Sequence, residues 1–184
     1  MCDNPLLDTK FYAFLQRIDE ELAAETRAGG CRRCTGRLHR DRYRRKPRGG
    51  PRGLDQAYWY RLSFTCAICD KRHTPVSVRF LGRRIYLAAV VVLASALRSG
   101  LNDRSVGQLT EWIGVPKRTI ERWRRWWLRE FVDSPFWTNA RARFMPPLEA
   151  AALPASLLGR FRGLDLSSQL TAALRLLAPL SEGG

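Results

Sequence analysis

The chain of 184 residues has the length of one domain, or of two small domains that share a core. Its net charge of +15 at pH 7 favours a polyanionic partner, above all nucleic acid. The longest apolar run, residues 85–97, is too short for a bilayer, which needs roughly 20 residues, and the start MCDNPLLDTK lacks a secretion signal. We therefore expect a cytoplasmic protein with no membrane partner, in which paired cysteines bind metal rather than form disulfides.

The positive charge is concentrated in one part of the sequence. Residues 1–26 contain two basic and six acidic side chains, whereas residues 27–61 contain twelve basic and two acidic ones. A GC-rich genome would explain why arginine outnumbers lysine, but it would not explain the excess of positive over negative charge. We expect a basic surface that begins at the first cysteine pair and continues through the middle of the chain.

Residues 1–30 are predicted to form an amphipathic helix that ends at Gly29 and Gly30. Apolar side chains recur there at helical spacing. They are Leu7, Phe11, Phe14, Ile18 and Leu22. The opposite face is acidic and unsuited to DNA, so we expect this helix to pack on the rest of the protein or on a second copy.

Two cysteine pairs with the same spacing, CRRC and CAIC, follow this helix. Each pair places two sulfurs on one side of a turn, and two such turns complete a closed tetrahedral site for one structural Zn²⁺ ion. The predicted ligands are Cys31, Cys34, Cys66 and Cys69. Buried or disulfide-linked cysteines are the alternative. His39 and His73 are expected at the surface or on phosphate, and Cys2 is expected as a free thiol.

Residues 31–84 are predicted to form a zinc ribbon with a basic loop. The 31 residues between the cysteine pairs exceed the common insert of about 15–20. The stretch GRLHRDRYRRKPRGGPRGLDQ lacks apolar periodicity, which predicts a mobile loop, whereas YWYRLSFTC and HTPVSVRFLGRR read as short strands. The cations expected on the phosphate backbone or in a minor groove are Arg40, Arg42, Arg44, Arg45, Lys46 and Arg48. A solvated loop without a fixed role is the alternative.

Residues 85–130 are predicted to be helical and to contain a helix-turn-helix. An apolar helix comes first, and RSVGQLTEWIGVPKRTIERWRRWW follows it. The apolar face of the first helix of the motif would consist of Val106, Leu109 and Ile113. Gly114 allows a tight turn, Val115 fills the corner, and Pro116 suits the first position of the second helix.

The second helix of this motif separates apolar from cationic side chains. Ile120, Trp123 and Trp127 share one face and are expected to pack inward. The cations expected to point toward a major groove are Lys117, Arg118, Arg122 and Arg125. Two ordinary core helices with a basic rim are the alternative.

The order of these motifs resembles the N-terminal half of bacterial zinc-ribbon insertion-sequence transposases. The resemblance covers about residues 31–130 and rests on the cysteine pairs, SVRFLGRR, the apolar helix and LTEWIGVPKRTIERW. It implies that the ribbon and the helix-turn-helix recognise the terminal repeats of a mobile element. In that family a nuclease domain with a DDE metal triad follows.

The sequence after residue 130 departs from that family. Its acidic residues are Asp133, Glu149, Asp165 and Glu182, on a helical stretch interrupted by prolines. The remaining length is far below that of a typical domain, so we expect the catalytic half to be missing and no nuclease activity. The many apolar side chains of residues 131–184 instead predict a helical region that contacts protein: the chain's own core, a second copy, or a separately encoded recombinase or transposase.

These expectations define an α+β fold, mainly α, in a non-catalytic, zinc-stabilised protein that binds duplex DNA. A bacterial, nucleoid-associated protein of a mobile element is the first interpretation. A transcriptional regulator with the same DNA-binding elements is the alternative, followed by a metal-dependent nuclease and an RNA-binding ribbon. A recombinase gene beside this one would favour the first over the second, and a Mg²⁺-dependent cleavage assay addresses the third.

Overall fold

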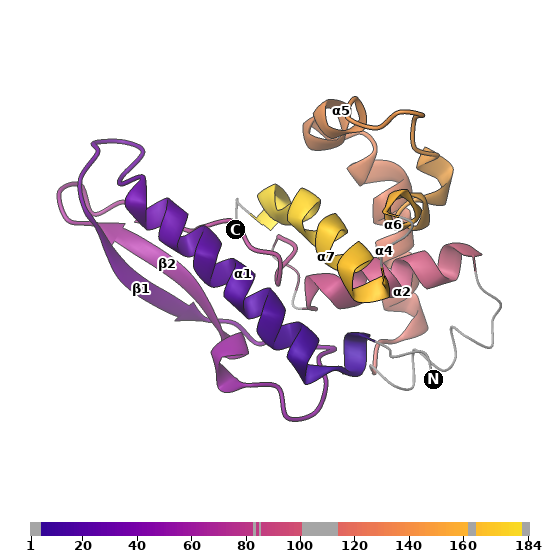
Figure 1. Ribbon diagram of the computed structural model, residues 1–184, viewed down its shortest axis with the longest axis horizontal. Helices are drawn as coiled ribbons and strands as arrows, with labels where there is room; N and C mark the ends of the chain where they lie inside the picture. The colour runs from indigo at the N-terminus through magenta and orange to yellow at the C-terminus, as the bar shows by residue number, and fades with distance from the viewer. Residues whose placement is uncertain (1–4, 83, 85, 101–113, 162–164, 182–184) are drawn as a thin grey trace. The chain divides into compact units, whose positions relative to one another are not determined.

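The computed structural model describes residues 5–82, 84, 86–100, 114–161 and 165–181, and it is mainly helical with one small antiparallel sheet (Figure 1). The predicted class, α+β with more helix than strand, is confirmed. The chain divides into two compact units. The first unit comprises Met1–Leu87 with Leu174–Gly184, and the second unit comprises Ala88–Ala173. This division differs from the four regions expected from the sequence, because the end of the chain returns to the first unit.

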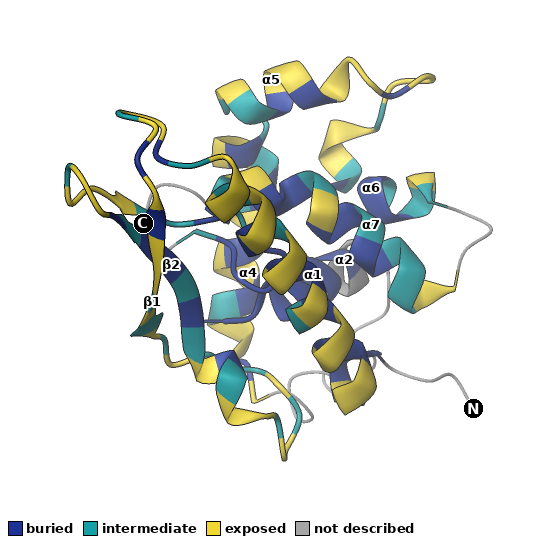
Figure 2. Ribbon diagram, turned by 60° about the vertical axis from the view of Figure 1, so that its left-hand side comes forward, coloured by how far each residue is buried: buried dark blue, intermediate teal, exposed yellow. Residues whose placement is uncertain are grey.

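The predicted N-terminal helix is present as α1, Thr9–Ala28. Asp8 caps it by accepting a hydrogen bond from the backbone N–H of Lys10 at 2.8 Å, and Gly29 ends it. Figure 2 shows that one flank of α1 is buried and the other exposed. The apolar pattern was only partly correct, because Phe14 is 45% exposed and Tyr12 takes a fully buried position instead.

The sheet of the first unit consists of β1 (Leu38–Arg44), β2 (Tyr60–Cys66) and β3 (Arg72–His73), in that order and antiparallel. The mobile loop predicted after the first cysteine pair is therefore wrong over β1. Only Leu38 of this strand is fully buried, so apolar alternation is absent from its sequence. The strand forms because every residue from Leu38 to Arg44 pairs with one on β2, and α1 contacts β2.

A buried ion pair ties α1 to the segment after β3. Asp19 and Arg79 are 5% and 3% exposed, and Arg79 Nε lies 2.6 Å from Asp19 Oδ2. Ser77 Oγ donates to the same oxygen at 2.6 Å, and the Val78 backbone N–H donates to Oδ1 at 2.8 Å. Both oxygens of a buried carboxylate are thus satisfied, which makes this pair a structural element of the first unit.

A second buried arginine connects the sheet to the end of the chain. Arg61 of β2 is 3% exposed and donates to the backbone oxygens of Pro75 and Ser181, each at 2.9 Å. Ser181 Oγ also accepts from the Ser77 backbone N–H at 2.7 Å. Arg61 and Arg79 therefore contribute to the net positive charge of the chain but not to an exposed basic surface.

The second unit is built around α2, Ala88–Gly100, whose residues from Ala88 to Ala94 are all buried. Such a uniformly apolar helix belongs at the centre of a helical core. It contacts α4 and α6. In the part of this unit that the structure describes, α2 is followed by α4 (Lys117–Trp126), a π-helical turn (Trp127–Phe131), α5 (Pro135–Arg141), a 3₁₀ turn (Ala150–Ala152), α6 (Ala155–Arg160) and α7 (Leu166–Leu177), whose last residues belong to the first unit. Among the described residues, no helix combines the length and the apolar character that a membrane span requires.

Most of the large apolar side chains of residues 131–173 that the structure describes are buried within the folded chain. Trp137, Leu157 and Leu170 are 3% exposed or less, and Trp127, Phe131 and Trp137 form a chain of ring contacts. The sequence left three possibilities for this apolar surface: burial in the chain's own core, contact with a second copy, or contact with a recombinase or transposase. Burial in the chain's own core accounts for most of it.

Candidate metal centre

The first cysteine pair lies in a tight turn directly after α1. The Cys31 backbone N–H donates to Gly36 O at 2.9 Å, and the Thr35 N–H donates to Cys31 O at 2.8 Å. The Arg33 N–H points to Cys31 Sγ at 3.4 Å. Thr35 has a φ of 57°, in the left-handed region, which bends the chain back after Cys34.

The second pair, at the end of β2, forms a turn with the same pattern of backbone hydrogen bonds. The Cys66 N–H donates to Lys71 O at 3.0 Å, and the Asp70 N–H donates to Cys66 O at 3.2 Å. The Ile68 N–H points to Cys66 Sγ at 3.4 Å, and Asp70 has a φ of 54°. Two copies of one turn, each with an N–H group directed at a sulfur, are the arrangement that an anionic thiolate needs.

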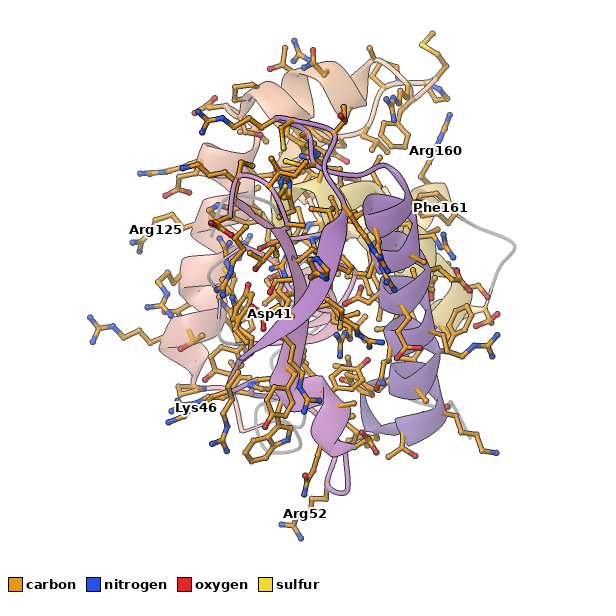
Figure 3. The ribbon with its side chains drawn as sticks, turned by 90° about the vertical axis from the view of Figure 1, so that its left-hand side faces the viewer. Asp41, Lys46, Arg52, Arg125, Arg160 and Phe161 are labelled. Carbon is orange, nitrogen blue, oxygen red and sulfur yellow. The ribbon has the colours of Figure 1, made fainter. Side chains whose placement is uncertain are left out.

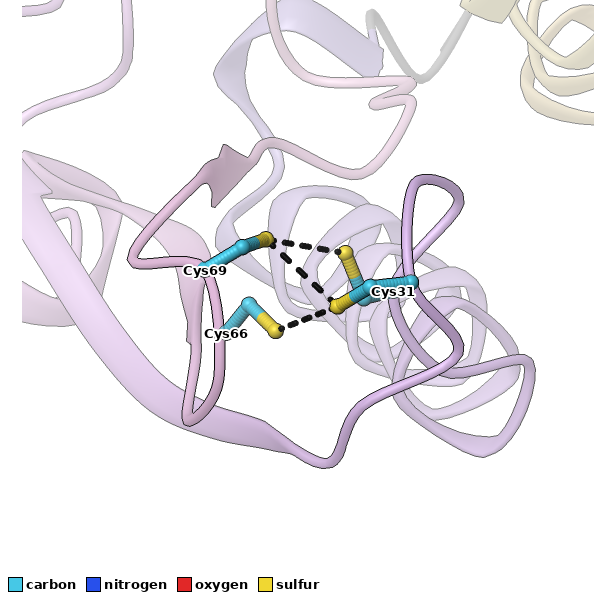
Figure 4. A group of neighbouring side chains, drawn as sticks. Cys31, Cys66 and Cys69 are labelled. Carbon is cyan, nitrogen blue, oxygen red and sulfur yellow. Dashed lines mark hydrogen bonds between the residues drawn. The ribbon is translucent and has the colours of Figure 1, made fainter.

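The two turns bring all four predicted sulfurs together (Figure 4). The Sγ atoms lie within 4.8 Å of one another, with separations of 3.4 Å for Cys34–Cys66 and 3.6 Å for both Cys31–Cys69 and Cys34–Cys69. A tetrahedron with Zn–S bonds of about 2.3 Å has edges of about 3.8 Å. The four cysteines therefore have the spacing of a closed four-sulfur site. In the described part of the chain, they form the one such group of potential metal ligands.

The thiols of the site differ in acidity, and the pKa values of Cys34 and Cys66 are shifted in opposite directions. The backbone N–H groups of Cys69 and Ile68 lower the pKa of the Cys66 thiol to about 6. The Gly36 N–H is the largest single influence on Cys34 and lowers its pKa, but the side chains of Cys66, Cys69 and Cys31 together with burial outweigh it and raise this pKa to about 12. Without a cation, the hydrogen bonds among these sulfurs thus favour a thiolate at Cys66 and a neutral thiol at Cys34, whereas a divalent metal favours the ionised form of its ligands.

The site is part of the core of the first unit. Cys31 and Cys66 are 2% and 0% exposed and pack in one cluster with Ala23 of α1, Leu38 of β1 and Phe64 of β2. The four cysteines therefore lie where the end of α1 meets the sheet, and an ion bound by them would join the two.

His73 is closer to the site than expected from the sequence. Its Nε2 lies 3.2 Å from Cys31 Sγ, and β3 holds it opposite Phe64 on β2. The group of mutually close ligand atoms contains the four sulfurs without His73, which therefore borders the site beside the sulfur of Cys31. The sequence did offer a sign of this proximity, because His73 follows Cys66 by only seven residues. Cys2 lies outside the described residues.

Gly36 gives a specific test of the site, because a side chain there would enter it. A Cβ at Gly36 would lie 2.9 Å from Cys66 Sγ, closer than real Cβ contacts. We expect Gly36→Ala to lower zinc affinity roughly 10- to 100-fold, the usual cost of disturbing the surroundings of metal ligands. Competition with a chromogenic chelator measures this. Gly29→Ala is the control, since its Cβ would meet atoms only at 3.6 Å or more, and an equal effect of both changes would contradict this geometry.

The structure places five of the six cations predicted after the first cysteine pair on an exposed surface. They are Arg40, Arg42, Arg44, Lys46 and Arg48. Arg45 is different, because it is half-buried and its guanidinium donates to the backbone oxygens of Gly82 at 3.3 Å and Arg84 at 3.0 Å. It has a structural role in the first unit, and sequence reasoning had no signal to separate it from its neighbours.

The predicted faces of α4 are present. Ile120 and Trp123 of α4 are buried, as is Trp127 directly after it. The four predicted cations, Lys117, Arg118, Arg122 and Arg125, are all exposed. Gly114 has a φ of 60° and Val115 is fully buried, whereas Pro116 lies one residue before the helix, at the N-cap position, and not at its first position as predicted. The first helix of the predicted motif, with Val106, Leu109 and Ile113, lies outside the described residues.

Comparison of the chain with protein-family models, with curated proteins and with solved structures found no match. The class that the fold and the site define is therefore a mainly helical α+β protein with four cysteines able to hold one metal ion. Its function is inferred from its own residues.

Proposed function

We propose that this chain is a non-catalytic DNA-binding protein stabilised by one Zn²⁺ ion, in which α4 is the recognition helix of a helix-turn-helix. The observation that carries the proposal is the separation of faces on α4: its cations are exposed while Ile120 and Trp123 are buried. A short helix that buries aromatic and aliphatic side chains and exposes a row of cations suits a major groove. The left-handed Gly114 and the buried Val115 directly before it suit the turn of such a motif.

The metal in this proposal is zinc, because all four donor atoms are sulfurs and the distances between them suit a tetrahedral site. Cys31, Cys34, Cys66 and Cys69 would hold the ion, and four thiolates leave no open position for a substrate or a catalytic water. When bound, the ion supplies charge neutralisation and a rigid junction between the two turns. The site is thus a structural one.

The exposed cations of the first unit would add phosphate contacts. Arg40, Arg42 and Arg44 alternate along β1, so they share one face of the strand, and Lys46 continues the row beyond it. Cations on a paired strand are held more rigidly than cations on a free loop, so phosphate binding costs less conformational entropy.

We place this function in a mobile genetic element. The proposed protein partner is a separately encoded recombinase or transposase, or a second copy of the chain. Both rest on the order of the sequence motifs. The transcriptional alternative shares all the DNA-binding residues and differs only in the position of the DNA site.

Two sets of substitutions test whether α4 in the second unit provides sequence preference while the cations of the first unit provide phosphate contacts. Arg118→Ala with Arg122→Ala should lower the preference for a selected duplex site over random duplex roughly 10- to 100-fold, because base-edge contacts carry specificity. Lys46→Ala with Arg48→Ala should weaken binding to all duplexes alike and reduce the slope of log affinity against log salt by about 2. Fluorescence anisotropy after in vitro site selection measures both quantities.

Arg143→Ala, which removes an exposed cation outside both sets, is the matched control and should change neither the preference nor the salt slope by a comparable amount. Equal losses on selected and random DNA for the α4 variant would contradict the assignment of a recognition helix.

A further inference from the structure

Two aromatic rings lie at the end of the sheet where β1 ends and β2 begins. Trp59, the last residue of a short 3₁₀ turn (Gln56–Trp59), is 42% exposed, and Tyr60 opens β2 and is half-buried. Together with Arg44 and Gln56 they line a hollow of about 140 Å³. This volume is well below the roughly 300–1,000 Å³ of sites that bury a drug-sized ligand, so the hollow suits one ring system.

The rings are surrounded by cations. The guanidinium of Arg42 lies 4.5 Å from the centre of the Tyr60 ring, and that of Arg44 lies 5.4 Å from the centre of the Trp59 ring. Lys46 and Arg52 project from the same end of the sheet (Figure 3). The hollow therefore combines aromatic faces with positive charge, and Gln56 adds an amide that can both donate and accept hydrogen bonds.

The turn that presents Trp59 is rigidly held. Asp55 Oδ1 accepts from the Ala57 backbone N–H at 2.6 Å, and the Arg45 N–H donates to Trp59 O at 2.6 Å. Tyr58, next to Trp59, is 1% exposed, and its hydroxyl donates to the backbone oxygen of Tyr12 on α1. The neighbours of Trp59 are thus fixed in the core while its own ring stays at the surface, as expected for a binding residue rather than a poorly packed one.

We propose that this hollow binds an unpaired base of single-stranded DNA adjoining the duplex. The base would stack on the aromatic faces, Gln56 would contact its edge, and Arg44 with Lys46 would contact the adjoining phosphates. Stacking on aromatic rings needs no particular base, because every base has a π-face. The proposal rests on the proposed DNA-binding function and adds a second kind of DNA structure to it.

Anisotropy titrations of the zinc-loaded full chain test this proposal with three ligands: a blunt duplex, the same duplex with a short single-stranded thymine overhang, and that overhang made of abasic nucleotides. The overhang should tighten binding and the abasic overhang should not. Trp59→Ala should remove the gain, a loss of roughly 10- to 100-fold, while blunt-duplex affinity stays unchanged. Trp59→Phe should retain most of the gain, and Arg52→Ala should weaken all three ligands alike.

The failures of the two proposals are distinguishable. Tight binding of the blunt duplex with no gain from the overhang, or an equal gain from the abasic overhang, overturns the base-binding hollow alone. Binding of the overhang strand without any binding of duplex overturns the proposed helix-turn-helix function instead. A tighter complex with the RNA strand of the same sequence overturns the assignment to DNA. Because the abasic comparison uses the unchanged protein, the test does not depend on the folding of a variant.

Discussion

Cys66→Ser is expected to release the metal and to unfold the part of the first unit that the two cysteine turns hold together. Cys66 is fully buried, lies 3.4 Å from Cys34 Sγ, and pairs through its backbone with Leu38 of β1. Structural zinc sites have apparent binding free energies of about 10–16 kcal/mol, comparable with or larger than the whole stability of many domains. One missing ligand should therefore decide whether the sheet forms.

Zinc content by elemental analysis and thermal unfolding by circular dichroism measure this effect. The wild-type chain should contain one zinc per molecule, and the variant should contain none and lose cooperative unfolding of the first unit. Cys2→Ser removes the cysteine outside the four-sulfur group and should retain the metal and the melting temperature. Full zinc occupancy in Cys66→Ser with unchanged melting would refute the four-cysteine site.

Asp19→Asn is expected to lower the free energy of unfolding by about 3–5 kcal/mol, since it leaves the buried Arg79 guanidinium without a counter-charge. The two side chains are only 5% and 3% exposed, so water cannot replace the lost partner. The amide that replaces the carboxylate also cannot accept at both positions where Ser77 Oγ and the Val78 N–H now donate.

Glu21 provides the matched control on the same helix. It lies 3.9 Å from Arg175, and both side chains are more than half exposed. Glu21→Gln should change the free energy of unfolding by no more than about 0.5 kcal/mol, as is usual for exposed ion pairs. Urea denaturation of both variants gives the comparison, and equal free energies of unfolding would mean that the buried pair contributes no more than the exposed one.

The cysteine turns and α4 could be predicted because their signals are local. Two Cys-x-x-Cys pairs specify four ligands irrespective of what lies between them, and Ile120 and Trp123 mark the inner face of α4 by their spacing alone. Both predictions needed no knowledge of partners distant in the sequence.

The strand β1 could not be predicted, because the interactions that specify it are not local in the sequence. Its residues from His39 to Arg44 are polar, aromatic or charged, and the strand is specified by pairing with β2 and by the two cysteine turns at the end of the sheet where β1 begins and β2 ends. Nonlocal pairing of this kind leaves no periodic signal in the strand itself.

The buried arginines show the same limit on the prediction of function. Arg45, Arg61 and Arg79 all count toward the positive charge of the sequence, yet each donates to internal oxygens, and Arg45 had been predicted to contact DNA. Burial of a cation depends on an acceptor elsewhere in the chain, such as Asp19 on α1 for Arg79. Net charge alone therefore overstated the number of cations available to nucleic acid.

Duplex binding by the zinc-loaded chain over a range of salt concentrations tests the central claim most directly. If β1 and α4 both contact phosphates, log affinity should fall linearly with log salt with a slope of magnitude about 5 or more between about 50 and 200 mM salt. Removal of zinc with a chelator should abolish the contribution of the first unit and flatten that slope. The absence of duplex binding at about 50 mM salt, or an affinity independent of salt and of zinc, would contradict a metal-stabilised DNA-binding protein.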